Sequence, residues 1–177
     1  MLTDDKADIN PIGADNMKPF TLKKAAKAVG GTESGEAKLC GVSIDSRTVK
    51  DGELYVALIG ENFDGHSFAE SAVKNGAAAV MISHDIGVDC PKIKVENTES
   101  ALMKLASWYR DRFDIPVVGL TGSVGKTTTK EMICAVLGSE KKTMKTQGNL
   151  NNQIGVPRTL FTIEEDTEAA VVEMGMD

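Results

Sequence analysis

A glycine-rich segment set between an apolar run and an amphipathic run constrains the fold of this chain most strongly. Residues 119–129 read Gly-Leu-Thr-Gly-Ser-Val-Gly-Lys-Thr-Thr-Thr. The apolar run at 115–120 has the composition of a buried parallel strand, and residues 131–137 repeat apolar side chains at helical spacing. A turn of this kind typically holds a phosphate chain, because its backbone N–H groups and the helix N-terminus both face the anion. The segment therefore predicts nucleotide binding in an α/β fold.

The residues of this loop have separate expected roles. Gly122 and Gly125 let the backbone curl toward an anion. Lys126 would reach the β- and γ-phosphates, and the Thr127 hydroxyl would ligate the Mg²⁺ that bridges them. The usual motif has a glycine where Leu120 stands, so this loop is the shorter form Thr-Gly-x-x-Gly-Lys-Thr. The alternative is a Gly-Lys-Thr turn that binds no ligand.

A carboxylate lies at the end of the apolar strand expected at 169–174. Glu173 lies near the end of that strand. In nucleotide-binding sheets an acidic residue at such a strand end completes the Mg²⁺ shell, directly or through water. Glu173 and Thr127 are therefore the candidate metal ligands, and the alternative for Glu173 is a solvated strand end.

Three polar loops are further candidates for ligand contacts. Residues 148–157 contain three Asn and one Gln within six positions. Amide side chains suit a polar neutral ligand or phosphate edges, although such a composition is more often a turn. The loops at 45–49 and 60–66 follow neighbouring expected strands, where ligands of open α/β sheets bind. Arg47 could pair with a pyrophosphate, but alone it would more often form a surface ion pair.

Composition and charge exclude several classes of protein. The net charge of −6 argues against a general nucleic-acid binder. No apolar run approaches the roughly 20 residues that span a bilayer, so we expect no membrane insertion. Residues 1–18 are acidic and lack an apolar core, so they do not form a signal peptide. We expect residues 1–16 to be a disordered tail and the folded part to begin at Met17.

The cysteines and histidines give no disulfide framework and no zinc site. Cys40, Cys90 and Cys134 are widely separated and lack Cys-x-x-Cys spacing. We expect three reduced, mostly buried thiols in a cytoplasmic protein. His66 by itself is more often structural than catalytic and nothing pairs with it in the sequence, while His84 is expected at the surface.

Strands and helices alternate along the whole chain, which predicts α/β architecture with largely parallel sheets. Helices are expected at 20–29, 67–75 and 98–113, and strands at 41–45, 53–59, 78–83, 92–96, 142–146 and 169–174. The break at Asp114-Ile115-Pro116 predicts one domain at 17–114 and a second at 115–177. The second region supplies about three strands where a covered parallel sheet around such a loop needs about five. We therefore expect the chain to be a piece of a longer protein.

Taken together, these motifs resemble the Mur ligases of bacterial cell-wall synthesis. The short loop Thr121 to Thr127 is a hallmark of that family, which shares it with folylpolyglutamate synthetase. The family's amino-terminal domain has segments similar to three in this chain, which are Asp45-Ser46-Arg47 and the residues at 52–58 and 60–66. The string at 148–157, with Val172-Glu173-Met174-Gly175, points to the member that adds D-alanyl-D-alanine.

The resemblance implies a small UDP-substrate-binding α/β domain followed by the start of a P-loop-type, parallel-sheet ATPase domain. It implies an ATP-dependent ligase that uses Mg²⁺, with UDP-N-acetylmuramoyl-tripeptide and D-alanyl-D-alanine as substrates, and that is a monomer at full length. The implied ATP-binding residues are Gly122, Ser123, Val124, Gly125, Lys126, Thr127 and Thr128, with Lys126 as the catalytic residue. The implied substrate-binding residues are Ser46, Arg47, Glu61, Asn62, Phe63, Asn151 and Asn152. Thr127 and Glu173 would hold the metal.

Several alternatives remain open at this point. Family members have three domains, and this chain would lack most of the second and all of the third, so the fragment alone is expected to be inactive. A non-catalytic module that binds a nucleotide or a UDP-sugar is one alternative. The related ligase that adds the third peptide residue is another. A folate-type ligase would share the phosphate loop but would not explain the loops at 45–49 and 60–66.

Overall fold

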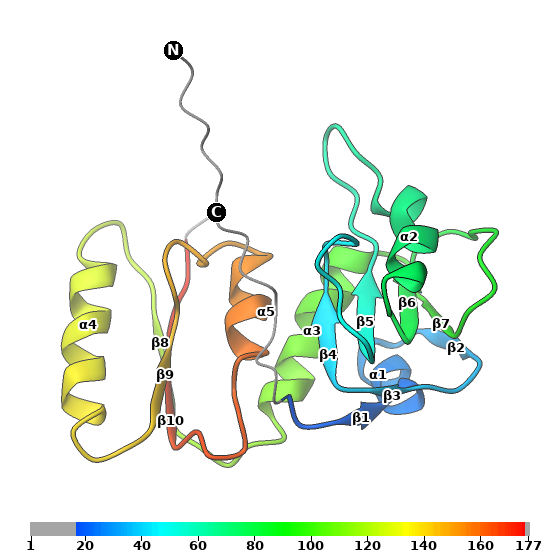
Figure 1. The fold of residues 1–177 in the computed structure, drawn as a ribbon. Coiled ribbons are helices and arrows are strands. Elements are labelled where there is room, and N and C mark those ends of the chain that lie inside the picture. The colour runs from blue at the N-terminus through cyan, green and yellow to red at the C-terminus, as the bar shows by residue number, and fades with distance from the viewer. Residues whose placement is uncertain (1–16, 176–177) are drawn as a thin grey trace.

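The computed structural model describes residues 17–175, so the tail expected at 1–16 lies outside the described residues. Two α/β units lie side by side, each built on its own sheet (Figure 1). In chain order the helices are α1 (Leu22–Val29), the 3-10 helix η1 (Gly65–Phe68), α2 (Ala69–Lys74), α3 (Thr98–Arg110), α4 (Lys126–Leu137) and α5 (Gly155–Leu160). The strands are β1 (Phe20–Thr21), β2 (Thr32–Ser34), β3 (Lys38–Leu39), β4 (Gly41–Ser43), β5 (Glu53–Val56), β6 (Ala79–Ile82), β7 (Lys92–Lys94), β8 (Val117–Leu120), β9 (Thr143–Lys145) and β10 (Ala169–Glu173). The predicted α/β fold class is confirmed.

The first unit is built on a sheet with the strand order β2-β7-β6-β5-β4. The strands from β4 to β7 run parallel, and β2 pairs antiparallel with β7 at one edge. Side chains of β5 alternate between the two faces, as the pleat requires. Leu54 and Val56 share an apolar cluster with α1 and α3, whereas Tyr55 shares another with α2. Helices therefore cover both faces, which is why β4, β5 and β6 are buried along their whole length, whereas β7 is only partly buried.

The second unit contains a parallel sheet with the order β8-β10-β9. The α4 helix packs on one face, and α5 packs on the other face, between this sheet and α3 (Figure 1). The central strand β10 is buried along its whole length, but β8 and β9 are only partly buried. This arrangement places the glycine-rich loop, which joins β8 to α4, at one end of the sheet.

A shared apolar core connects the two units. Tyr109 of α3 and Phe113, which follows α3, belong to the same buried cluster as Phe161 and Ile163, which follow α5. The Tyr109 and Phe161 rings lie 5.8 Å apart. The Tyr109 hydroxyl donates a hydrogen bond to the Ile163 carbonyl at 2.9 Å and accepts one from the Lys18 N–H at 2.9 Å. The division into domains at 17–114 and 115–177 stays a prediction, and this shared core lies across it.

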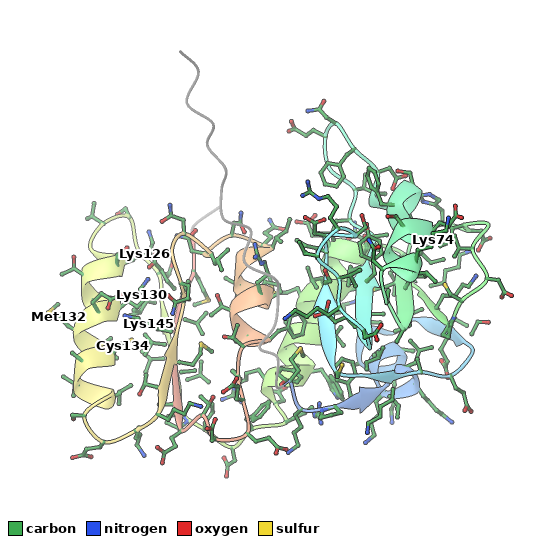
Figure 2. The ribbon with its side chains drawn as sticks, viewed as in Figure 1. Lys74, Lys126, Lys130, Met132, Cys134 and Lys145 are labelled. Atoms are coloured by element: carbon green, nitrogen blue, oxygen red, sulfur yellow. The ribbon has the colours of Figure 1, made fainter. Side chains whose placement is uncertain are left out.

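The apolar face expected on the helix after the loop is not covered within the described part of the chain. Met132 is 58% exposed and Val136 is 72% exposed. Figure 2 shows Met132 on the side of α4 that faces away from the sheet. The buried residue of this helix is instead Lys130. Periodicity alone predicted the wrong face because it marks which side chains are apolar, not which side meets the sheet.

Several local expectations also differ from the structure. The helix expected at 20–29 begins at Leu22, because Thr21 caps it and β1 pairs with β3. The segment 148–157, expected as a turn, contains the start of α5, which packs against α3. The short strands β2 and β3 were not expected at all, since their residues lack an apolar pattern. Cys40 is exposed and Cys90 and Cys134 are only partly buried, so the expectation of mostly buried thiols is wrong.

Candidate functional site

The glycine-rich loop has the backbone that the sequence predicts. Gly122 and Gly125 have φ values of 143° and 79°, in the region that favours glycine. Gly125 immediately precedes α4, and no side chain caps this end of the helix. The first N–H groups of α4 are therefore available to an anion. The Lys126 ammonium donates a hydrogen bond to the Gly122 carbonyl at 2.5 Å, so the lysine side chain lies over the loop. The other expected ATP-binding residues, Ser123, Val124 and Thr128, are exposed.

Glu173 is the centre of a buried polar network beside this loop. Its Oε2 lies 3.4 Å from the Thr127 hydroxyl and 3.2 Å from the Lys130 ammonium. Its Oε1 accepts a hydrogen bond from the Asn151 amide at 3.1 Å, and its backbone N–H donates to the Thr146 hydroxyl at 2.9 Å. Burial by itself raises the pKa of Glu173. Hydrogen bonds from Asn151 and Lys130 outweigh that effect and hold its pKa below the ordinary value.

Thr127 and Glu173 fit the oxygen-ligand chemistry of Mg²⁺. A hydroxyl and a carboxylate are ligand types that Mg²⁺ accepts, at an Mg–O distance of about 2.1 Å. Two oxygens 3.4 Å apart can both reach one such ion. The 3.4 Å separation is also long for an O–H···O hydrogen bond, so little is lost if an ion replaces that contact. The structure therefore brings together the two metal ligands that the sequence predicts.

The expected substrate loops follow β4 and β5 of the first unit. Arg47 donates two hydrogen bonds to Asp45, at 2.9 and 2.6 Å, and its side chain is 76% exposed. The hydrogen bond from Arg47 holds the pKa of Asp45 below its usual range. Ser46 is buried, and its carbonyl accepts a hydrogen bond from the Asn75 amide. Glu61, Asn62 and Phe63 are exposed.

These substrate loops and the nucleotide loop open toward the same side of the molecule. In Figure 1 the loops that follow β4, β5 and β8 all lie at the upper side. Asn151 contacts Glu173, as described above, and so connects the Asn-rich segment to the nucleotide loop. The Asn152 side chain instead accepts hydrogen bonds from the Ile154 and Gly155 N–H groups, and so supports the start of α5. The roles of these residues in substrate binding stay predictions.

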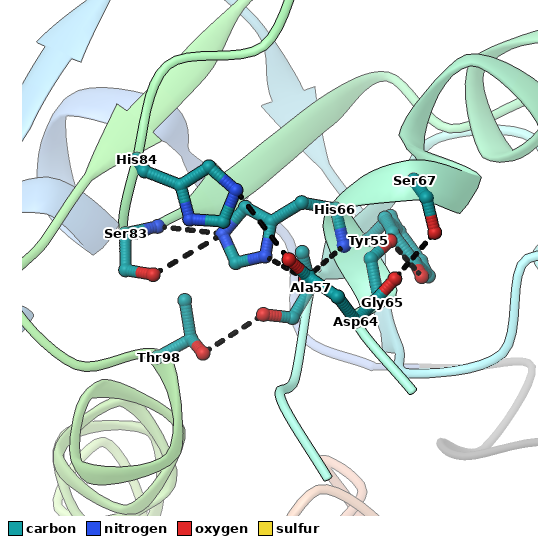
Figure 3. A network of polar contacts seen from close by, with 9 residues as sticks. All are labelled: Tyr55, Ala57, Asp64, Gly65, His66, Ser67, Ser83, His84 and Thr98. Carbon is teal, nitrogen blue, oxygen red and sulfur yellow. Dashed lines mark hydrogen bonds and ion pairs between the residues drawn. The ribbon is translucent and has the colours of Figure 1, made fainter. Parts of the chain in front are cut away.

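A second polar network in the first unit includes both histidines (Figure 3). The His66 Nε2 accepts a hydrogen bond from the Ser83 N–H at 2.8 Å, so Nδ1 carries the proton that is shared with Asp64 Oδ1 at 2.6 Å. His84 stacks on His66 with ring centroids 3.8 Å apart, and its Nε2 lies 3.5 Å from Asp64 Oδ2. The expectation that nothing pairs with His66 is therefore wrong, because its partner Asp64 lies two residues earlier.

The geometry of this histidine cluster favours a structural role over metal binding. Asp64, His66 and His84 bring three potential ligand atoms close together. However, both ring nitrogens of His66 already have partners. The two imidazoles are stacked nearly parallel, with an interplanar angle of 24°, so their in-plane lone pairs do not converge on one point. His66 is 5% exposed and joins the start of η1 to the end of β6.

Two residues that contact Glu173 beside the loop were not predicted from the sequence. Lys130 was not considered, although its position one turn after Thr127 places the two on the same side of the helix. Thr146 was also missed, because its contact with Glu173 depends on the pairing of β9 with β10. Only the spacing of Lys130 could have been read from the sequence.

The glycine-rich loop joins a strand to a helix, and a carboxylate at the end of a neighbouring strand faces it. This arrangement defines a P-loop-type nucleotide-binding unit. The profile of the Mur ligase family, catalytic domain, matches residues 38–110, and the profile of the Mur ligase middle domain matches residues 120–177. The chain belongs to the Mur ligase family.

Within this family the chain is similar to the ligases that act on UDP-N-acetylmuramoyl-tripeptide. It is 44% identical over 165 residues to the UDP-N-acetylmuramoyl-tripeptide–D-alanyl-D-alanine ligase of Bacillus subtilis, covering 88% of this chain and 36% of the relative. The crystal structure of MurF from Acinetobacter baumannii has a TM-score of 0.85 and 33% identity, over 90% of this chain and 36% of that one. MurF from Thermotoga maritima, solved in complex with ADP, has a TM-score of 0.69 and 36% identity, over 76% of this chain and 31% of that one.

The chain spans about a third of the length of the curated relatives that it matches. This share agrees with a match to an amino-terminal portion of those relatives. None of the helices between residues 17 and 175 has the length and apolar character that crossing a bilayer requires.

Proposed function

We propose that this chain is part of an ATP-dependent ligase that adds D-alanyl-D-alanine to UDP-N-acetylmuramoyl-tripeptide in peptidoglycan synthesis. The convergence of the Thr127 hydroxyl and the buried Glu173 carboxylate beside the Lys126 loop carries the proposal. This geometry supports Mg²⁺-dependent ATP binding. The names of the relatives support the identity of the two other substrates.

The proposed chemistry has two steps. A carboxylate oxygen of the tripeptide attacks the γ-phosphorus of ATP, and ADP leaves as the acyl phosphate forms. The amine of D-alanyl-D-alanine then attacks the acyl carbon, loses a proton and displaces inorganic phosphate. Lys126 places a positive charge beside the transferred phosphoryl group. Thr127 and Glu173 would hold Mg²⁺, which when bound neutralises further charge on the phosphates.

The substrate loops give the proposed binding mode of the UDP end. Ser46, Arg47, Glu61, Asn62 and Phe63 would contact it, and Arg47 can pair bidentately with its pyrophosphate. Asp45 already orients the Arg47 guanidinium through two hydrogen bonds. Asn151 and Asn152 would face the substrate and the γ-phosphate from the other unit. The loops that follow β4, β5 and β8 lie on the same side of the molecule, which supports a substrate that contacts both units (Figure 1).

A turnover experiment on the gene product at its full length tests this function. ADP and phosphate should form only when UDP-N-acetylmuramoyl-tripeptide and D-alanyl-D-alanine are both present. Lys126→Ala should lower the rate by about a hundredfold or more without unfolding the protein. Lys141→Ala, which removes an exposed lysine after α4, is the matched control. Equal turnover without the dipeptide would refute the ligase. UDP-sugar binding with no ADP formation would favour a non-catalytic module.

Isothermal titration of the 177-residue chain separates the two ligands. We expect weak binding of UDP-N-acetylmuramic acid through the loops after β4 and β5. We expect poor binding of Mg-ATP, because β8 and β9 are only partly covered in the second unit. Micromolar ATP binding with no response to the UDP-sugar would reverse this ranking of the two units.

A further inference from the structure

The helix that follows the nucleotide loop has a lysine as its buried residue. Lys130 is 2% exposed, whereas Met132 and Val136 of the same helix are mostly exposed. A lysine ammonium is rarely buried in this way, because removing a charge from water is costly unless a partner compensates it. Lys130 therefore occupies the position where an apolar residue would ordinarily attach α4 to the sheet.

The partner of Lys130 is the carboxylate beside the nucleotide loop. The Lys130 ammonium lies 3.2 Å from Glu173 Oε2, and the two side chains are 3% and 5% exposed. The same Oε2 faces the Thr127 hydroxyl at 3.4 Å, while Oε1 accepts a hydrogen bond from Asn151. The carboxylate is thus held by α4 on one oxygen and by the Asn-rich segment on the other.

Stability alone is a poor explanation for this pair. Well-packed apolar residues of similar volume often serve a protein's stability as well as a buried ion pair does, or better. What the pair does achieve is orientation. Lys130 and Asn151 bind different oxygens of Glu173, which fixes the rotation of the carboxylate and directs Oε2 toward Thr127.

We propose that Lys130 is a positioning residue for the Mg²⁺–nucleotide site, holding Glu173 Oε2 where it can share a metal ion with Thr127. This inference rests on the proposed function, since it assumes that Thr127 and Glu173 bind the metal. A carboxylate oxygen has a second lone pair, so Lys130 can keep its contact while Mg²⁺ occupies the side that faces Thr127. Partners that orient a ligand in this way commonly change metal affinity by about 10- to 100-fold when they are removed.

The expected sign separates positioning from simple charge repulsion. Removing a positive charge close to a cation site would, by Coulomb's law alone, tighten metal binding. If Lys130 acts by orienting Glu173, its removal weakens metal binding instead. The measurement is therefore metal affinity in the presence of ADP, followed by the electron paramagnetic resonance of Mn²⁺ and by Mg²⁺ competition, on the gene product at its full length.

Lys130→Met and Lys130→Gln are the test variants. We expect Lys130→Met to weaken Mn²⁺ binding by about tenfold or more, and Lys130→Gln, which keeps a hydrogen-bond donor, to weaken it less. Lys145→Met is the matched control, because Lys145 of β9 also pairs with α4, through Glu131 on the surface (Figure 2). It should leave Mn²⁺ affinity unchanged. Circular dichroism verifies that each variant is folded, and Lys130→Gln decides the question if Lys130→Met does not fold.

The outcomes distinguish the inference from the proposed function. Unchanged or tighter Mn²⁺ binding in the folded Lys130 variants overturns the positioning role, even if their melting temperatures fall. An equal loss of affinity in Lys145→Met would also overturn it, because the effect would then belong to the attachment of α4 in general. If the wild-type protein shows no metal-dependent ADP binding, the proposed function itself fails, and the inference fails with it.

Discussion

The Thr127 hydroxyl lies 3.4 Å from Glu173 Oε2, although 46 residues separate them in the sequence. The register of the sheet creates this contact. Strand β10 runs parallel to β8 with Glu173 opposite Leu120, and the nucleotide loop begins immediately after Leu120. A slip of one residue would turn Glu173 toward the opposite face of the sheet. The buried apolar residues of β10 therefore hold the carboxylate at the proposed metal site.

Replacing the Thr127 hydroxyl should remove metal-dependent nucleotide binding without affecting the fold. Thr127→Val keeps the side-chain shape at an exposed position but removes a proposed ligand. Mg²⁺ raises the ADP affinity of the wild type by some factor, and we expect that factor to be smaller by about tenfold or more in the variant. Titration of a fluorescent ADP analogue with and without Mg²⁺, on the gene product at its full length, measures this. Thr129→Val, an exposed threonine of the same helix, should behave as wild type, and a similar loss in both variants would contradict the assignment.

The buried Lys130–Glu173 pair should show strong coupling in stability measurements. Lys130→Met alone leaves the Glu173 carboxylate buried without its cation, which should cost about 3–5 kcal/mol. The double variant Lys130→Met with Glu173→Leu should recover most of that cost, because no buried charge remains. Urea unfolding of the two single variants and the double variant gives the coupling energy. Additive effects would show that the two side chains act independently.

The Asp64 carboxylate should make stability depend on acid pH. A hydrogen bond from the His66 backbone N–H, with a smaller contribution from the His66 ring, holds the pKa of Asp64 below its usual value. Because the folded pKa is the lower one, this stabilisation is complete above the unfolded pKa of about 3.9 and is lost as the pH falls through the folded pKa. Asp64→Asn keeps an amide oxygen that can accept the same hydrogen bond but removes the charge. It should therefore cost about 1 kcal/mol at pH 7, the difference between hydrogen bonds to charged and to neutral acceptors, and progressively less below about pH 4.

Urea unfolding of Asp64→Asn and wild type between pH 7 and about pH 3 checks this dependence. Asp89→Asn, in the segment before β7, removes an exposed carboxylate as the control and should destabilise the protein less than Asp64→Asn at pH 7. A cost for Asp64→Asn that is the same at all pH values would show that the ionised carboxylate is not the stabilising form.

The Tyr109 hydroxyl should matter for the attachment of the two units. Tyr109→Phe leaves the Ile163 carbonyl and the Lys18 N–H without their partner, which should cost about 1–3 kcal/mol. Tyr55→Phe is the matched control, since the Tyr55 hydroxyl donates to Gly65 within the first unit. Thermal unfolding compares the two in the whole chain and in residues 17–114 alone. The Tyr109 effect should shrink in the shorter protein, which lacks Ile163, whereas the Tyr55 effect should persist.

Arg47 should contribute to UDP-sugar affinity but not to stability. Its side chain is 76% exposed and is held by Asp45. Arg47→Ala should weaken binding of UDP-N-acetylmuramic acid by about tenfold or more, because a hydrogen bond to a charged group is worth roughly 1.5–3 kcal/mol. Isothermal titration measures the affinity. Lys74→Ala, an exposed lysine of the same unit that pairs with Glu70, should leave it unchanged. Equal affinities for wild type and Arg47→Ala would remove Arg47 from the proposed site.

Much of the nucleotide site was predictable because its determinants are local. Glycines at 122 and 125 adopt backbone angles that few other residues accept, and Lys126 and Thr127 follow at the helix start. Glu173 was also predictable, since a carboxylate that ends an apolar parallel strand lies at the same edge of the sheet as the loop. The polar loops after β4 and β5 were located for the same reason.

The order of residues along the chain was enough to predict the alternation of strands and helices, the phosphate loop and the two metal-ligand candidates, because each depends on neighbouring residues or on strand direction. The face of α4 that meets the sheet depends instead on tertiary packing, which buries Lys130 rather than Met132 or Val136. Tertiary packing also pairs His66 with Ser83, and Tyr109 with Ile163 in the apolar core that the two units share. These contacts depend on how elements far apart in the chain pack together, and the periodicity of a single segment carries no information about its packing partner.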